Sequence, residues 1–180
     1  MALTIPNRFF PGTLADADQV NADFDAVAAY VNSSLETVTT HNSDIALLPK
    51  GKVSGGYVQV TANQGSITTI VDLTSLTVTF TALASRYYKI TGYGQLQSTV
   101  ANDTAILTIA DGAGTQLQQT NVVLPVANAS EALMTQIAIQ PGAGSKTYKL
   151  RAARNTGTGT ITFAAGATFP GFILIEDIGL

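Results

Sequence analysis

The chain has 180 residues, 46% of them hydrophobic and 12% charged, against roughly 25% charged residues in an average soluble domain. It has no cysteine and one histidine, His41. Disulfides, thiolate metal sites and cysteine nucleophiles are therefore excluded, and imidazole catalysis has almost no residues to use. The net charge of −3 argues against a nucleic-acid binder, which needs a basic face. Composition indicates a structural or binding protein without a cofactor, and not an enzyme.

Neither an export signal nor a membrane span is expected. The N-terminal residues contain no basic segment followed by an apolar one, which a secretory signal requires. The best apolar run, residues 172–175, has the length of a strand, far below the ~20 residues needed to cross a bilayer.

The chain changes character near Pro49. The residues before it include one glycine, Gly12, and six acidic residues but a single basic one, Arg8. The residues after it include fifteen glycines, eight basic residues and six acidic ones. A break in glycine content and charge at one site predicts a module boundary. We therefore expect an N-terminal arm and helix over residues 1–49 and a β domain over residues 50–180.

The N-terminal part is expected to be an extended arm followed by a helix. Pro6 and Pro11 keep residues 3–13 out of a helix, because proline lacks an amide donor and pushes the preceding residue toward extended geometry. Asp16 is a suitable N-cap, and Gln19 completes a capping box. Asp18 places negative charge close to the start of the helix dipole.

The predicted helix carries apolar residues at heptad spacing. This apolar stripe consists of Val20, Phe24, Val27, Val31, Val38 and Ile45. Two further positions in the same register, Ser34 and His41, are polar. So narrow a stripe is typical of a seam between chains; packing of the stripe on the chain's own β domain is the alternative. Weak helix formers between residues 37 and 43 predict that the helix ends near Val38.

The remainder of the chain predicts short strands separated by turn signals. The expected strands are residues 53–60, 67–73, 76–82, 87–97, 104–110, 116–124, 132–140, 147–154, 160–164 and 172–178. In the third, Leu76, Val78 and Phe80 alternate with threonines, which buries one face and exposes the other. So many short strands predict a mainly β fold: a C-terminal β-sandwich of jelly-roll type, preceded by the arm and one α-helix. Few charges protect the sheet edges, which favours an oligomer.

Known catalytic and ligand-binding patterns do not fit this sequence. The aspartates from Asp16 to Asp25 lack the glycine and glutamate of a calcium loop. Glu176 and Asp177 are neighbours on a predicted strand and should point to opposite faces, so they do not form a hydrolytic pair. Gly92 and Gly94 lie inside a predicted strand and indicate a kink, not a phosphate loop.

Two groups of side chains leave alternatives open. Lys149 and Arg151 should share one strand face, with Lys146 and Arg154 on the other; a solvated face is the simplest interpretation, and pairing with a neighbour's acidic helix is the alternative. Five strand tyrosines could line a sugar site, although tyrosines in strands usually pack. They are Tyr57, Tyr87, Tyr88, Tyr93 and Tyr148.

Two segments resemble virion structural proteins of tailed bacteriophages. The segment IPNRFFPGTLADADQVNADFDAVAAYVN (residues 5–32) resembles the N-terminal arm that precedes a helix and a β-rich body in tail-fibre-like and head-appendage proteins. The final segment, from Tyr148 to Gly179, resembles the closing strands of jelly-roll bodies in the same class. Together they cover roughly a third to a half of the chain.

The resemblance implies a virion component assembled in the host cytoplasm, a homotrimer attached to capsid or tail proteins through residues 1–35. Attachment would be carried by Phe9, Phe10, Pro11, Asp16, Asp18, Asn21 and Phe24. The chain leaves no room for a fibrous shaft, which favours a compact capsid decoration protein or short appendage. A tail-fibre-like protein that binds a receptor or host glycan is the alternative. No nucleic acid and no membrane is expected as a partner.

Overall fold

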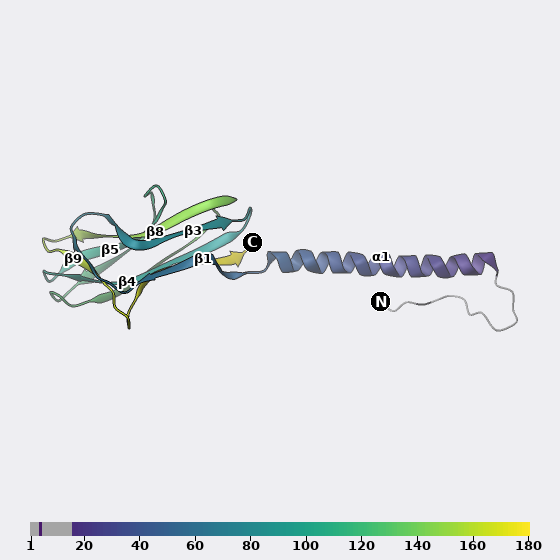
Figure 1. The fold of residues 1–180 in the computed structure, drawn as a ribbon, viewed down its shortest axis with the longest axis horizontal. Helices are drawn as coiled ribbons and strands as arrows, with labels where there is room; N and C mark the ends of the chain where they lie inside the picture. Colours follow the sequence, from purple (N-terminus) through teal and green to yellow (C-terminus); the bar gives the residue numbers. More distant parts are fainter. Residues whose placement is uncertain (1–3, 5–15) are drawn as a thin grey trace. The chain divides into compact units, whose positions relative to one another are not determined.

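The computed structural model describes residue 4 and residues 16–180, so the rest of the predicted extended arm lies outside the described residues. The chain forms two compact units, one ending at Leu48 and one running from Pro49 to Leu180. The first contains α1 (Ala17–Leu47), and the second contains the strands (Figure 1).

Helix α1 begins where the sequence predicts and ends later. Asp16 is the N-cap, and its carboxylate accepts a hydrogen bond of 2.9 Å from the Asp18 amide. The expected end near Val38 is wrong, because the helix continues to Leu47. The hydroxyls of the weak helix formers donate to carbonyl oxygens four residues earlier and so do not compete for the amides of the helix. These hydroxyls belong to Thr37, Thr39, Thr40 and Ser43.

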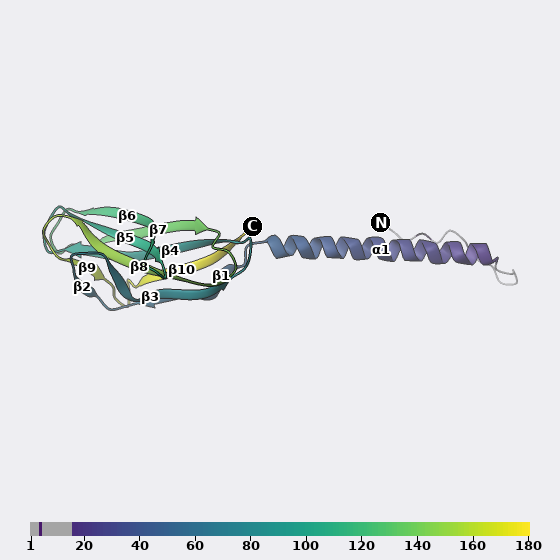
Figure 2. The same ribbon diagram turned by 90° about the horizontal axis from the view of Figure 1, so that it is seen from above.

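The second unit contains ten strands within the described residues. They are β1 (Gly51–Val60), β2 (Gln64–Ile67), β3 (Val71–Ala82), β4 (Tyr87–Ser98), β5 (Asp103–Asp111), β6 (Gln116–Leu124), β7 (Glu131–Ile139), β8 (Gly144–Thr156), β9 (Ile161–Ala164) and β10 (Gly171–Gly179). The first sheet has the order β1-β10-β4-β9-β2, with β7 on the other side of β4, and the second has the order β3-β8-β5-β6. Strands β6 and β7 lie side by side at one edge (Figure 2). The prediction of a mainly β, jelly-roll-like sandwich preceded by one helix is confirmed.

The core lies between the two sheets and follows the predicted alternation. Leu76, Val78 and Phe80 are buried, and the threonines between them are exposed. Ser75 interrupts the alternation with a φ of 63°, at a shift in the register between β3 and β8. This bulge lets both Leu73 and Leu76 face the core, although they are three residues apart.

Two local predictions are wrong. The strand expected over residues 67–73 is divided, because β2 ends at Ile67 and β3 begins only at Val71. The expected kink at Gly92 and Gly94 is absent, since β4 pairs with β7 without interruption there. Both glycines are buried, and a Cβ at Gly94 would collide with the ring of Phe163. Because glycine has no side chain, the ring of Phe163 can pack directly against the backbone of β4 at Gly94.

Candidate functional site

The apolar stripe of α1 is open to solvent. None of the helix's residues is buried, and Phe24, Val31 and Ile45 are 69%, 53% and 63% exposed. Helices in proteins gain most of their stability from burying such a face. Within its own compact unit, the helix leaves these side chains without cover.

The structure places the predicted attachment residues only in part. Phe9, Phe10 and Pro11 lie outside the described residues. The others lie at the N-terminal end of α1: the N-cap Asp16, and the exposed Asp18, Asn21 and Phe24. Every residue of the apolar stripe belongs to α1, as do the polar members of the same register, Ser34 and His41, which are also exposed.

The outer face of the first sheet carries a second apolar group, which we call the aromatic face; two of its side chains are exposed and three are half-buried. It consists of Tyr57, Tyr93, Met134, Phe172 and Leu174 on strands β1, β4, β7 and β10. The ring centroids of Tyr93 and Phe172 are 5.4 Å apart with stacked planes, and those of Tyr57 and Phe172 are 5.8 Å apart. Met134 is 55% exposed and Tyr57 40%.

Polar side chains border the aromatic face. The Tyr57 hydroxyl lies 2.6 Å from the Oε1 of Gln59, and the Gln136 amide donates to Thr91 Oγ1 over 3.1 Å. An ion pair of 2.6 Å joins Lys89 to Glu176. The border therefore combines hydrogen-bonding groups with this ion pair and with Lys52, which lies opposite Glu176 on β1.

The five strand tyrosines do not form one site. Tyr88 and Tyr148 lie in the core, with ring centroids 4.9 and 6.2 Å from that of Phe80. Burial raises the pKa of the Tyr148 hydroxyl, and the nearby charge of Asp111 adds to the effect. Of the five, only Tyr57 and Tyr93 belong to the aromatic face.

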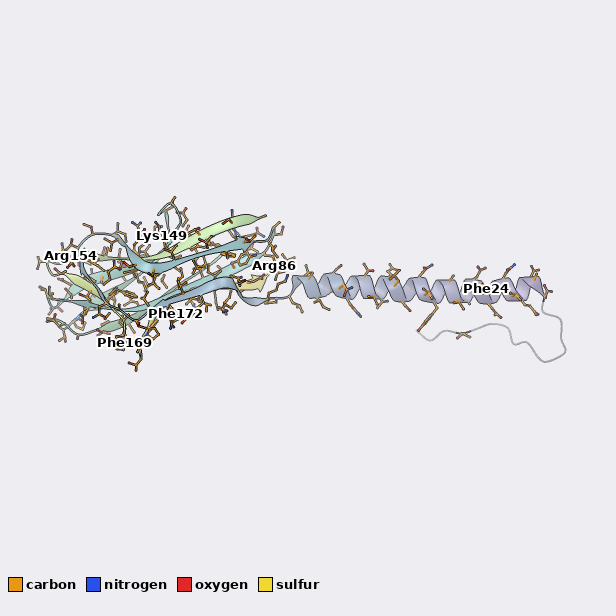
Figure 3. All side chains as sticks on the ribbon, in the orientation of Figure 1. Phe24, Arg86, Lys149, Arg154, Phe169 and Phe172 are labelled. Carbon is orange, nitrogen blue, oxygen red and sulfur yellow. The ribbon has the colours of Figure 1, made fainter. Side chains whose placement is uncertain are left out.

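The outer face of the second sheet is polar and carries the basic group. Lys149 and Arg151 share this face as predicted, and both reach Asp72 on β3, each over 2.7 Å. The hydrogen bond from Lys149 lowers the pKa of Asp72, although partial burial opposes the shift. Lys149 and Arg151 are thus paired with an acid of their own sandwich. Figure 3 shows Lys149 on one side of the sandwich and Phe172 on the other.

Glu176 and Asp177 point to opposite faces, as predicted. Glu176 pairs with Lys89 outside, whereas Asp177 is buried against Arg86, whose Nε and Nη2 donate to its two oxygens over 2.6 Å each. Burial alone would raise the pKa of Asp177, but hydrogen bonds from Arg86 and the Gly179 amide outweigh it and lower the pKa. Arg86 was not singled out by the sequence, because a lone arginine before a strand gives no signal.

The loop acids serve loop structure. Asp103 accepts hydrogen bonds from the Ser98 hydroxyl (2.6 Å) and from the amides of Thr158 and Gly159 (3.1 and 2.8 Å). The Ser98 bond and these amides lower the pKa of Asp103 despite its burial. Asp111 closes the β5–β6 turn by accepting from the Thr115 amide over 2.8 Å. These carboxylates hold loops together and do not converge on one another.

Two exposed apolar surfaces stand out among the described residues. Among residue 4 and residues 16–180, no three His, Cys, Asp or Glu side chains gather closely enough to hold a metal ion. No helix in this part of the chain combines the length and the apolar character needed to cross a bilayer. The two notable features are the apolar stripe and the aromatic face.

No protein-family model and no curated protein matches the sequence. Solved structures that match include the carbohydrate-binding module CBM36 in complex with calcium and xylotriose, at 14% identity and a TM-score of 0.35, covering 66% of this chain and 98% of the module. Module CBM6cm-2 from Cellvibrio mixtus lichenase 5A matches at 17% identity and a TM-score of 0.35, covering 70% of this chain and 90% of the module. A chain of infectious bursal disease virus, Gx strain, matches at 14% identity and a TM-score of 0.38, and 73% of this chain spans 38% of the viral one. Similarities at this level do not assign the chain to a family.

Proposed function

We propose that the chain is a non-enzymatic, homotrimeric structural protein of a tailed-phage virion, a capsid decoration protein or short appendage attached through its N-terminal arm. The observation that carries this proposal is the exposed apolar stripe of α1. A 31-residue helix with none of its residues buried gains its stability from other copies of itself when its apolar side chains repeat every heptad.

The residues of the stripe favour three chains. Val31 and Val38 occupy the a positions of the heptad, and Val20 and Val27 the d positions. β-branched residues at both positions shift the preference from two-stranded toward three-stranded coiled coils. The polar members Ser34 and His41 stand in the same seam and would fix the register of the chains, as polar core residues do in coiled coils.

Attachment to the particle rests on the resemblance of residues 5–32 to virion arms. In this proposal Phe9, Phe10 and Pro11 contact a capsid or tail protein, together with the start of α1. The sandwich then forms the exposed mass, and its closed core requires no further partner for stability.

Deletion of residues 1–20 from the chain in its phage tests attachment. The truncated protein should fold but be absent from purified particles, as judged by mass spectrometry of the virions and by electron microscopy of the position it normally occupies. Particles that carry the truncated protein at the normal copy number would contradict the proposal.

A further inference from the structure

The two outer faces of the sandwich differ in chemistry. The face of β3-β8-β5-β6 presents threonines and the ion pairs of Asp72 with Lys149 and Arg151. The aromatic face, on the opposite sheet, presents rings, a leucine and a methionine. A surface centre rich in aromatic residues and methionine, and poor in charge, is characteristic of protein–protein interfaces.

The strand register assembles the aromatic face into rows. Phe172 lies opposite Tyr93 on β4, which in turn lies opposite Met134 on β7. In the next row Tyr57 on β1 lies opposite Leu174. The apolar side chains thus form a continuous group across four strands of one sheet.

The orientation of the rings favours a protein surface as the occupant over a sugar. Side chains stand roughly perpendicular to a sheet, and the planes of Tyr93 and Phe172 are only 25° apart at 5.4 Å. Each ring therefore covers part of its neighbour's face. A sugar that stacks on aromatic residues needs free ring faces, whereas side chains of a second protein can pack against ring edges.

Resting on the proposed function, we infer that the aromatic face is the contact between the sandwiches of neighbouring copies in the same assembly. Three residues separate Leu47, the end of α1, from Gly51, the start of β1, and three residues span at most about 10 Å. Chains joined through the apolar stripe therefore hold the first residues of their β1 strands close together. Since β1 belongs to the sheet that carries the aromatic face, copies of this face meet at high effective concentration.

The charges of the face lie at its border and leave its apolar centre free for contact around the threefold axis of a trimer. Its charged row consists of Lys52 on β1, Glu176 on β10 and Lys89 on β4, in which Glu176 lies between the two lysines and pairs with Lys89 over 2.6 Å. Gln59 and Gln136 at the border supply hydrogen-bonding groups of the kind found at the rim of an interface.

Cysteine labelling of the full chain tests this inference, because the native sequence contains no cysteine. Met134→Cys places a thiol on the aromatic face, and Val123→Cys places one on the outer face of β6 in the other sheet. The two side chains are 55% and 54% exposed, which makes them a matched pair. Sedimentation equilibrium establishes the mass of each variant. The rate of reaction with a maleimide reports how far the introduced thiol is shielded from solvent.

We expect both variants to be trimeric. Met134→Cys should react at about one tenth of the rate of Val123→Cys or more slowly, because labelling then requires local opening of the contact. Adding Val31→Asp and Val38→Asp, which break the apolar stripe, should make both variants monomeric and equally reactive. Adding Phe172→Lys instead should speed labelling of Met134→Cys while the helix-joined trimer persists.

The two proposals fail in distinguishable ways. An intact trimer in which both cysteines react at the same rate would overturn the inference and leave the apolar stripe as the seam. A monomeric native chain would overturn the proposed function and the inference with it. Protection of Met134→Cys that develops in the trimer only after bacterial lipopolysaccharide is added would overturn the inference by assigning the face to a glycan.

Discussion

The sandwich and helix α1 use apolar residues in opposite ways. In the sandwich Ile90, Leu107, Leu150 and Ile175 are fully covered by their own chain. In α1 the apolar stripe remains exposed, with Phe24 at 69%. The comparison teaches that the sandwich buries its apolar residues within itself, whereas the helix leaves its own exposed, as the proposed association of chains requires.

Association of chains through the apolar stripe would bury the apolar side chains that α1 leaves exposed. Burying a valine or phenylalanine side chain stabilises by about 1.5–3 kcal/mol, and the stripe offers six such side chains of similar size per chain. Hydroxyls that donate back to the helix in residues 37–43 slightly weaken it. Association and helix formation should therefore be lost together.

The largest effect is expected from Val31→Asp combined with Val38→Asp. Each substitution places an unpaired charge in the seam at a cost of several kcal/mol. The trimer should dissociate to monomers, and the helical signal in circular dichroism should fall, while the sandwich itself remains folded in the absence of urea.

Ser33→Asp combined with Thr40→Asp is the matched control. These positions lie on the same exposed helix but outside the seam, and they receive the same added charge. The control should remain trimeric; if it dissociates as fully as the seam variant, net charge and not the apolar stripe governs assembly.

Within the sandwich, Asp177→Asn should have the largest effect, because it leaves the buried Arg86 without its carboxylate. The folded state holds the pKa of Asp177 low, so its stabilising contribution exists above the ordinary carboxyl pKa and is lost as pH falls through the lower folded value. Urea denaturation should show the native sandwich losing stability below about pH 4 and the variant losing less.

Glu176→Gln is the control for that variant. Glu176 is adjacent in sequence but forms its pair with Lys89 at the surface, where such pairs contribute about 0–1 kcal/mol. A loss of stability as large as that of Asp177→Asn would show that burial of the Arg86 pair is not the cause.

A smaller effect is expected from Gly94→Ala. The new Cβ would collide with the ring of Phe163, and overpacking of this kind costs about 1–3 kcal/mol of the free energy of unfolding. The trimer should persist at the same protein concentration. Gly65→Ala is the control, since a Cβ there meets only Thr162 Oγ1 at 3.4 Å; equal losses in both variants would exclude the Phe163 ring as the reason.

The smallest effect concerns salt. Helix α1 contains five acidic residues and no lysine or arginine, so associated helices repel one another. Raising the ionic strength from about 0.1 to 1 M shortens the screening length from about 10 to 3 Å and should tighten the trimer a few-fold in sedimentation equilibrium. A variant with Asp25→Asn and Glu36→Gln should respond less; a response equal to that of the native chain would contradict helix repulsion.

Much of the fold could be predicted because its signals are local. Alternation along residues 76–82 and the cap at Asp16 depend only on neighbours in the sequence. The division between β2 and β3 could not be predicted, because Thr68, Thr69 and Ile70 favour strands, yet the chain leaves the strand there.

The non-local features had no signal in the sequence. Gly94 fits beneath Phe163, a residue of another strand, so the sequence alone indicated a kink. The aromatic face forms only when strand register brings Tyr57, Tyr93 and Phe172 together from three strands. The apolar stripe, by contrast, could be found from the sequence, because heptad spacing is a local pattern.

The mass of the unmodified full chain in solution is the most direct test of helix-driven assembly. Sedimentation equilibrium over a range of micromolar concentrations should give three times the mass of the 18.7 kDa chain, with a parallel rise in helical signal as the trimer forms. A single chain at every concentration, with α1 still fully helical, would contradict the central claim that the helix exists to join copies of this protein.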